Sequence, residues 1–173
     1  MLKRPSWKCD AMLEILAERP GQPVVVFAPS RQLAMIAGEM AAEAGRRVGH
    51  IVGLGGGITA KTRQADIAAF AAGKLDLIAA TTGAGGTGID GLQVAGTAVI
   101  LQRPRPLGSS IQAEDRVHRI GSEIHAKGVE IIDVVAEDTV DEIIREQLVA
   151  KGGMAGQLFR DPSFVRGLLG GIR

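Results

Sequence analysis

Five runs rich in branched apolar residues recur along the chain, and helical patterns lie before, between and after most of them. The runs cover residues 23–28, 47–52, 75–82, 97–102 and 128–135. Runs this continuous are typical of strands that are buried on both faces, and strands that alternate with helices form parallel sheets. The pattern therefore predicts a single α/β domain with an open, mainly parallel sheet of about five or six strands and helices on both faces.

Helices are expected at residues 6–18, 30–44, 59–72, 109–120 and 138–150. Most begin at or near a serine or threonine, whose side chain accepts hydrogen bonds from the first turn of a helix. Gly152 and Gly153 break the last helical pattern. We therefore expect residues 1–150 to form the domain and residues 151–173 to form a C-terminal appendage, either flexible or docked on the domain or a partner.

Length and composition limit the classes of protein that the chain can belong to. Its 173 residues suffice for one hydrophobic core and are too few for two lobes of typical size. No apolar run approaches the roughly 18 residues of a membrane span, and the single cysteine, Cys9, excludes an internal disulfide. We expect an intracellular protein without a metal site, and the excess of Arg over Lys suggests a bacterial or phage origin. The net charge of +1 means that any DNA contact needs a local patch.

The predicted helix at residues 109–120 separates polar from apolar positions. One face carries Gln112, Arg116 and Arg119 at i, i+4 and i+7, and apolar residues lie roughly 100° away on the helix. A guanidinium fork matches phosphate oxygens and stays charged at physiological pH, so this face has the chemistry of an arginine finger. The spacing fits equally well a surface helix with ion pairs at i, i+4.

The segment Gln112–Gly121 reads Gln-Ala-Glu-Asp-Arg-Val-His-Arg-Ile-Gly. It resembles motif VI of the Swi/Snf-type branch of superfamily 2 helicases and DNA translocases. The resemblance implies a RecA-like fold and the C-terminal lobe of such a motor. It also implies that Arg116 and Arg119 reach the phosphates of ATP bound by a partner lobe, and that Gln112 lies at the nucleotide cleft. Ser122 departs from the Gln that is usual in this family.

The glycine loop after the third run contains the Gly-x-Gly-x-x-Gly pattern of dinucleotide-binding proteins. Such a site needs a long helix that opens at the third glycine, and only residues 89–96 separate this loop from the next strand. The loop is instead similar to motif V of the same helicase family. The resemblance implies that Thr81 and Thr82 contact the DNA backbone, and that Gly88 and Asp90 lie at the nucleotide cleft.

A second glycine loop, residues 55–62, lacks one glycine of a P-loop because Ala60 precedes Lys61. A Cβ at this position intrudes on the path that wraps the β-phosphate. No Asp-Glu pair directly after a strand supplies the magnesium ligands that a P-loop requires. Lys61 and Thr62 are therefore expected to form the exposed first turn of a helix.

The resemblance covers roughly residues 6–150 and implies the second lobe of an ATP-dependent DNA helicase or translocase. ATP and Mg would then be bound mainly by an N-terminal lobe, in cis or in trans, and the chain alone is expected to be inactive as an ATPase. One alternative is a stand-alone, non-catalytic DNA-binding or regulatory module that retains the lobe fold. Another is an independent phosphate-transfer enzyme that uses Lys61 and Thr62.

DNA contacts are expected to involve the backbone rather than the bases, because a translocase moves along any sequence. The candidates are Ser30, Thr81 and Thr82, with Arg31 and Lys74 as weaker ones. Each of these side chains also fits an ordinary role at a strand end or in a helix cap. The sequence leaves open whether the track is a single or a double strand.

Overall fold

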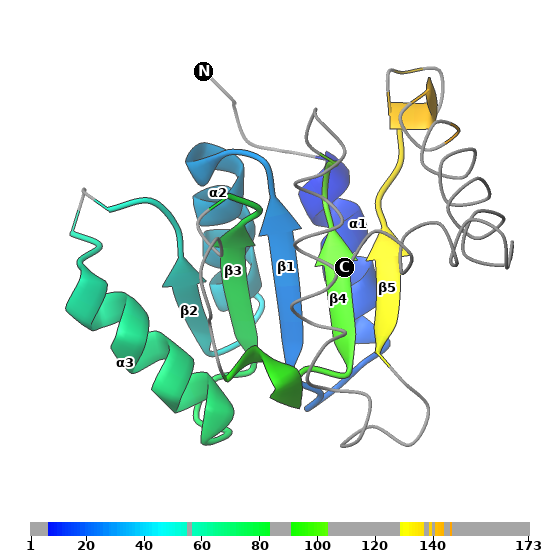
Figure 1. Cartoon of the computed structure of the whole chain (residues 1–173). Helices are drawn as coiled ribbons and strands as arrows, with labels where there is room; N and C mark the ends of the chain where they lie inside the picture. Colours follow the sequence, from blue (N-terminus) through cyan, green and yellow to red (C-terminus); the bar gives the residue numbers. More distant parts are fainter. Residues whose placement is uncertain are drawn as a thin grey trace, which may run out of the picture. The chain divides into compact units, whose positions relative to one another are not determined.

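All five predicted runs form strands of one parallel sheet in the computed structural model (Figure 1). The spatial order is β2-β3-β1-β4-β5, and each neighbouring pair is parallel. The strands are β1 (Val24–Ala28), β2 (Val48–Ile51), β3 (Leu77–Thr81), β4 (Thr97–Ile100) and β5 (Glu130–Asp133). The predicted α/β fold with a mainly parallel sheet is therefore confirmed.

The structure describes residues 7–54, 57–83, 91–103, 129–136, 139, 141–143 and 146. Contacts divide the chain into two compact units, Met1–Val135 and Ala136–Arg173. The sheet belongs to the first unit. The boundary predicted at residue 150 lies outside the described residues and stays a prediction.

Three predicted helices are present within two residues of their expected ends. They are α1 (Trp7–Ala17), α2 (Arg31–Glu43) and α3 (Ala60–Ala71), and a short 3₁₀ helix, η1 (Leu92–Val94), precedes β4. The helix expected at residues 109–120 lies outside the described residues. In the second unit, residues 141–143 and 146 are helical, as expected for the segment 138–150.

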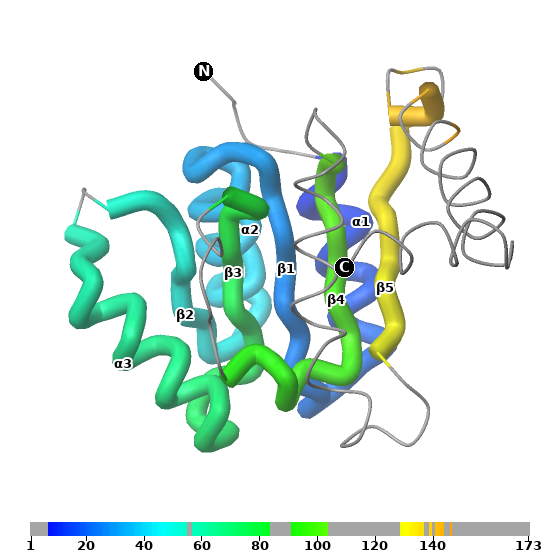
Figure 2. The backbone as a smooth tube through the Cα atoms, in the orientation of Figure 1, coloured from blue at the N-terminus to red at the C-terminus, as the bar shows by residue number. Residues whose placement is uncertain are grey.

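Helices cover both faces of the sheet (Figure 2). Successive residues of a strand point to opposite faces, so the strands contribute side chains to a core on each face. In β1, Val24, Val26 and Ala28 pack with α1 and α2 in one buried cluster. Val25 and Phe27 point to the other face, where the cluster includes residues of α3 and η1. Every residue of β1, β3 and β4 is buried, which explains why their sequences are apolar without alternation.

Two helices begin and end with capping interactions that the sequence encodes locally. Ser30 caps α2, since its hydroxyl accepts a hydrogen bond from the backbone N–H of Leu33, and Thr59 caps α3 in a capping box. Each helix ends in a Schellman motif with a left-handed glycine, Gly45 at φ +87° and Gly73 at φ +70°. These caps set where the chain enters and leaves the sheet.

The strand order contains a point at which successive connections run to opposite sides of the sheet. The connection after β1 leads through α2 to β2 at one side of the sheet, whereas β5 lies on the other side of β4. In open α/β sheets, ligands bind outside the carboxyl ends of the strands, at the point where the connections diverge. We call the region at and just after these strand ends the carboxyl edge, and the opposite region the amino edge.

The second unit has its own local hydrogen bonds. The hydroxyl of Thr139 donates to the carbonyl oxygen of Ala136 at 2.9 Å and accepts from the backbone N–H of Asp141 at 3.2 Å. The carboxylate of Asp141 in turn accepts from the backbone N–H of Ala136 at 3.3 Å. These bonds are typical of a capped helix start, and they precede the helical residues 141–143.

Candidate functional site

The carboxyl edge brings together the three described residues that the sequence assigned to DNA contact. Ala28 of β1 pairs with Thr81 of β3, and the backbone N–H of Thr82 donates to the carbonyl oxygen of Ala28 at 3.0 Å. Ser30 follows β1 by two residues, so it lies beside the end of β3. Their clustering follows from the parallel register of two adjacent strands.

The three side chains differ in how much surface they offer. Ser30 is exposed, and its hydroxyl accepts the capping bond from Leu33 at 3.2 Å, which leaves the hydroxyl proton available for donation. Thr81 and Thr82 expose only 8% and 6% of their surface. Ser30 is therefore the most accessible hydroxyl of the set, and it also has the helix-cap role that the sequence left open.

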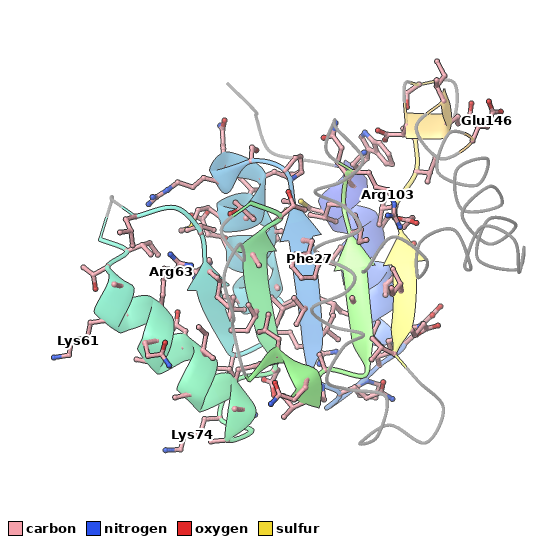
Figure 3. The ribbon with its side chains drawn as sticks, viewed as in Figure 1. Phe27, Lys61, Arg63, Lys74, Arg103 and Glu146 are labelled. Atoms are coloured by element: carbon pink, nitrogen blue, oxygen red, sulfur yellow. The ribbon has the colours of Figure 1, made fainter. Side chains whose placement is uncertain are left out.

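Arg31 extends the carboxyl edge across the sheet. One guanidinium nitrogen donates to the carbonyl oxygen of Gly53 at 2.5 Å, which links the start of α2 to the end of β2. Lys74, the other weaker candidate, lies between α3 and β3 at the amino edge (Figure 3). The structure thus groups Arg31 with Ser30 and separates Lys74 from both.

An ion pair at the same edge was not predicted from the sequence. Arg103 follows β4, and its guanidinium donates to both carboxylate oxygens of Asp133, the last residue of β5, at 2.7 Å each. The two side chains are 13% and 32% exposed. Each residue lies at or near the end of a predicted strand. The pair could be predicted only with the further knowledge that β4 and β5 are neighbours.

The former P-loop candidates form the first turn of α3, as expected. The hydroxyl of Thr62 donates to the carbonyl oxygen of Thr59 at 2.9 Å and accepts from its backbone N–H at 2.8 Å. The Thr62 hydroxyl is therefore engaged in the capping box, whereas a P-loop hydroxyl binds magnesium. Lys61 is exposed at the start of the helix (Figure 3).

The dinucleotide reading also finds no support in the described residues. Between residue 91 and β4 the structure contains η1, which has three residues, and no longer helix. A dinucleotide site needs a helix of about ten residues after its glycine loop. The motif V interpretation of this loop remains the prediction for residues 84–90, which lie outside the described part.

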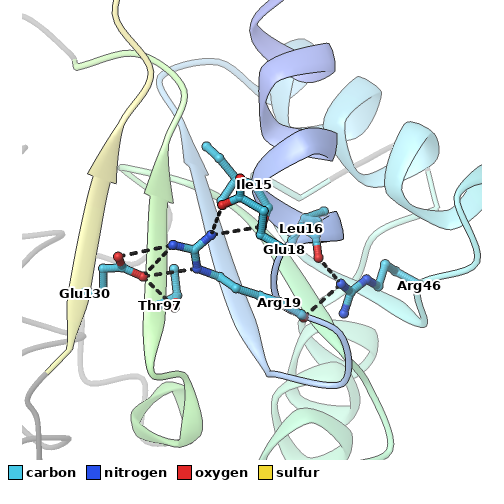
Figure 4. A network of polar contacts seen from close by, with 7 residues as sticks. All are labelled: Ile15, Leu16, Glu18, Arg19, Arg46, Thr97 and Glu130. Carbon is cyan, nitrogen blue, oxygen red and sulfur yellow. Dashed lines mark hydrogen bonds and ion pairs between the residues drawn. The ribbon is translucent and has the colours of Figure 1, made fainter.

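At the amino edge, arginine side chains donate hydrogen bonds to carboxylates and to backbone carbonyl oxygens (Figure 4). Arg19 donates to both carboxylate oxygens of Glu130 at 3.0 to 3.2 Å, and Arg46 donates to the carbonyl oxygens of Leu16 and Arg19. Arg47 forms a similar bidentate pair with Asp76, at 2.6 and 2.9 Å. This hydrogen-bonded guanidinium lowers the pKa of Asp76 to about 2.

Within the described part of the chain, two hollows lie at this amino edge. The larger has a volume of about 410 Å³ and is lined by the ends of α1 and α2, including Leu13, Pro20 and Arg46. The smaller measures about 150 Å³ and shares Gly21 and Asp76 with it. The described residues that the sequence assigned to DNA contact, Ser30, Thr81 and Thr82, lie at the opposite, carboxyl edge.

The remaining predicted site residues lie outside the described part of the chain. They are the arginines of motif VI and the proposed cleft residues: Arg116, Arg119, Gln112, Gly88 and Asp90. Within the described ranges, no cluster of three His, Cys, Asp or Glu residues could hold a metal ion. No helix among those ranges has the length and apolar character needed to cross a membrane.

Comparison with known families gives a match over most of the sheet domain. The sequence model described as "Helicase conserved C-terminal domain" matches residues 7–121. The Nuclear protein STH1/NPS1 of Saccharomyces cerevisiae is 33% identical over 84 residues, which are 49% of this chain and 6% of the yeast protein. The chain therefore spans a small part of this relative.

Solved structures share the fold at low sequence identity. The C-terminal part of the Fun30 ATPase domain has a TM-score of 0.68 at 23% identity, over 84% of this chain and 47% of that one. The Sulfolobus solfataricus SWI2/SNF2 ATPase C-terminal domain has a TM-score of 0.60 at 20% identity, covering 86% and 57%. The Pyrococcus furiosus Hef helicase domain has a TM-score of 0.62 at 22% identity, covering 81% and 28%. These structures show the same fold, and the family match confirms the resemblance to a helicase C-terminal domain.

Proposed function

Because the chain belongs to the helicase conserved C-terminal domain family, we propose that it is the second lobe of an ATP-dependent DNA helicase or translocase. The observation that carries the proposal is the extent of the family match, since residues 7–121 include both the motif V loop and the motif VI segment. In this role Arg116 and Arg119 stabilise the charge that develops on the transferred phosphoryl group. Gln112, Gly88 and Asp90 line the same cleft.

The DNA track in this proposal runs over the carboxyl edge. Ser30, Thr81 and Thr82 lie at the ends of two adjacent strands, where hydroxyls and backbone N–H groups can meet phosphate oxygens. Contacts of this kind carry no sequence information, which suits a motor that steps along any sequence. The net charge of +1 adds no strong general field, so we expect weak binding by the lobe alone.

An N-terminal lobe supplies the remaining parts of the active site in this proposal. It binds ATP and Mg, because the chain's own glycine loops lack a complete P-loop and Thr62 is engaged in a helix cap. The chain spans between 28% and 57% of the solved chains described above, which is consistent with one lobe of a longer assembly. The yeast relative is named a nuclear protein, and an intracellular site of action is part of the proposal.

The test measures ATP hydrolysis with and without DNA. The pure 173-residue chain is expected to show none, and activity should appear when the N-terminal lobe from the parent gene or its neighbour is added. In the completed motor, Arg116→Ala and Arg119→Ala should each reduce kcat by about 10³- to 10⁵-fold. Lys61→Ala, an exposed change on α3, is the matched control and should leave kcat unchanged.

Two results would reject the proposal. DNA-stimulated hydrolysis by the pure chain would show that it holds its own nucleotide. Normal kcat of the completed motor in the double variant Arg116→Ala, Arg119→Ala would remove the arginine-finger role. The alternative, a DNA-binding or regulatory module, predicts instead that DNA binding survives the double substitution and that no added lobe produces hydrolysis.

A further inference from the structure

The larger of the two hollows at the amino edge is lined entirely by described residues of the first unit. Its volume of about 410 Å³ lies within the range of roughly 300–1,000 Å³ that is usual for ligand pockets. Its apolar wall consists of Leu13, Leu16, Ala17 and Pro20. Leu16 belongs to the buried core on this face of the sheet and Leu13 packs against that core, so the wall has a fixed shape. The DNA and nucleotide residues named above take no part in this hollow.

Arg46 lies on the polar side of the hollow, and its guanidinium is only partly engaged. The nitrogen Nη2 donates to the carbonyl oxygens of Leu16 and Arg19, the latter at 3.0 Å (Figure 4). Nε and Nη1 donate no hydrogen bond in the described part of the chain, and no carboxylate there lies within ion-pair distance of the group. Neither nitrogen is buried. The guanidinium is therefore held in position while two of its nitrogens remain available to an acceptor.

The charge balance of the hollow favours an anion with a single charge. Asp76 is the one carboxylate in its wall, and Arg47 compensates it through a bidentate pair at 2.6 and 2.9 Å. The charge of Arg46 therefore determines the sign of the ligand. The hollow also lies at the C-terminal ends of α1 and α2, where the helix dipoles oppose negative charge. A carboxylate is consequently favoured over a phosphate group, whose higher charge suits helix N-termini.

We propose that this hollow binds an acidic peptide segment of a partner protein, in which an Asp or Glu adjoins a bulky apolar residue. The carboxylate accepts a charge-assisted hydrogen bond from the guanidinium of Arg46, and the apolar side chain packs against Leu13 and Pro20. A small metabolite is a poorer match, since pockets for such ligands present several convergent polar groups and this hollow offers one uncompensated group. A peptide gains further affinity from contacts outside the hollow, and arginines in pockets often anchor such interfaces. This site goes beyond the proposed function and does not depend on it.

The experiment records amide NMR spectra of the full chain during titration with N-acetyl-Leu-Asp amide at millimolar concentrations. Saturable shifts are expected at Leu13, Gly21 and Gly45, which line the hollow. No shift is expected at Ser30 on the opposite edge. The Leu-Asn analogue should bind about 10- to 100-fold more weakly, because it lacks the charge that strengthens the bond to Arg46. The Gly-Asp analogue should bind about 5- to 30-fold more weakly, since it lacks the apolar side chain.

Two variants of one exposed residue separate binding from folding. Ala17, the last residue of α1, lines the hollow, so Ala17→Glu introduces a carboxylate that repels the probe, whereas Ala17→Gln adds a similar volume without charge. The Glu variant should bind the probe at least about 5-fold more weakly than the Gln variant. Lys61→Gln, which removes an exposed charge at the start of α3, is the matched control and should bind like the wild type. The absence of saturable shifts at the hollow, equal affinity for the Leu-Asn analogue, equal affinity in the two Ala17 variants, or tighter binding of inorganic phosphate would each overturn the proposal.

Discussion

His50 occupies a position where a single glycine makes room for its ring. A Cβ added at Gly38 of α2 would lie 2.4 Å from Nε2 of His50, so the ring contacts the helix backbone directly. Nε2 is buried and has no hydrogen-bond partner. Burial lowers the pKa of His50, although the carboxylates of Asp66 and Glu39 act in the opposite direction.

We expect the fold to lose stability as the pH falls below neutrality because of His50. Its pKa is lower in the folded state than in the unfolded chain, so the unfolded chain binds more protons near pH 6. The full stability is present above about pH 6.5 and declines below it, by at most about 1.4 kcal/mol per pH unit. Urea denaturation at pH 7.5 and 5.5 measures the decline, and His50→Gln should reduce it. Equal declines in both proteins would contradict this account.

Asp76 also contributes stability that is lost as the pH falls, but at a more acidic pH. Its pKa is lowered from 3.8 to about 2 by the hydrogen bonds from Arg47, so the folded state favours the carboxylate. The resulting stability is present above about pH 4 and is lost as the pH falls through 2. Because Arg47 is largely exposed, we expect about 1 to 2 kcal/mol rather than the full value of the shift.

Asp76→Asn should therefore lower the free energy of unfolding at pH 7 by about 1 to 2 kcal/mol and reduce the loss between pH 4 and pH 2. Glu18→Gln serves as the control, because Glu18 is 76% exposed and its contact with Arg19 measures 3.3 Å. Denaturation curves at pH 7, 4 and 2 give the comparison. Parallel acid declines in wild type and Asp76→Asn would show that the Arg47 pair does not set the pH dependence.

At the scale of elements, the ends of α2 and α3 depend on two left-handed glycines. Gly45 and Gly73 have open space where a Cβ would lie, so alanine there causes backbone strain and no clash. We expect Gly45→Ala and Gly73→Ala each to destabilise the fold by about 1 kcal/mol. Gly53 has open space but no left-handed backbone, so Gly53→Ala is the control and should be nearly neutral or slightly stabilising. Thermal denaturation distinguishes these outcomes, and equal midpoints in all three variants would disprove the capping argument.

Strand β5 lies at the edge of the described sheet and is held by a charged pair at each end. Glu130 bonds Arg19 at the amino edge, and Asp133 bonds Arg103 at the carboxyl edge. Asp133→Asn removes the charge that makes the second pair strong, so the end of β5 should open more easily. We expect hydrogen exchange at the N–H of Val134, which bonds the carbonyl oxygen of Ile100, to rise about 5- to 30-fold. Exchange in β1 and β3 should stay constant, and a uniform rise across the sheet would indicate global destabilisation instead.

The elements were predictable because their signals are local. The five strands follow from continuous apolar runs, and Ser30 and Thr59 mark helix starts by their own side chains. Strand order carries no such signal, and the pair of Arg103 and Asp133 depends on it, since 30 residues separate the two. The positions of Ser30 and Lys74 do not depend on strand order. Ser30 follows the run 23–28 and Lys74 precedes the run 75–82, so in a parallel sheet the two lie at opposite edges.

At the scale of the whole molecule, the two edges of the sheet have different properties. The amino edge is closed by bidentate pairs, such as Arg47 with Asp76, that stabilise the fold. The carboxyl edge carries the exposed hydroxyl group of Ser30, which can meet a ligand. In the proposed function DNA binds at the carboxyl edge, so substitutions in the pairs at the amino edge should alter unfolding without altering DNA affinity.

In the proposed function, nucleotide binds to the assembly of two lobes, and this leads to a prediction about Thr62. Its hydroxyl is engaged by Thr59 in the capping box of α3, so Thr62→Ala should lower the free energy of unfolding by about 1 kcal/mol through loss of the cap. Calorimetry should show no saturable binding of MgATP to the pure chain at millimolar concentrations. If the N-terminal lobe holds the phosphates as proposed, Thr62→Ala and Lys61→Ala should leave the affinity of the completed motor for MgATP unchanged. A weaker affinity in either variant would mean that this glycine loop itself binds nucleotide, which would contradict the proposal that the N-terminal lobe alone holds the phosphates.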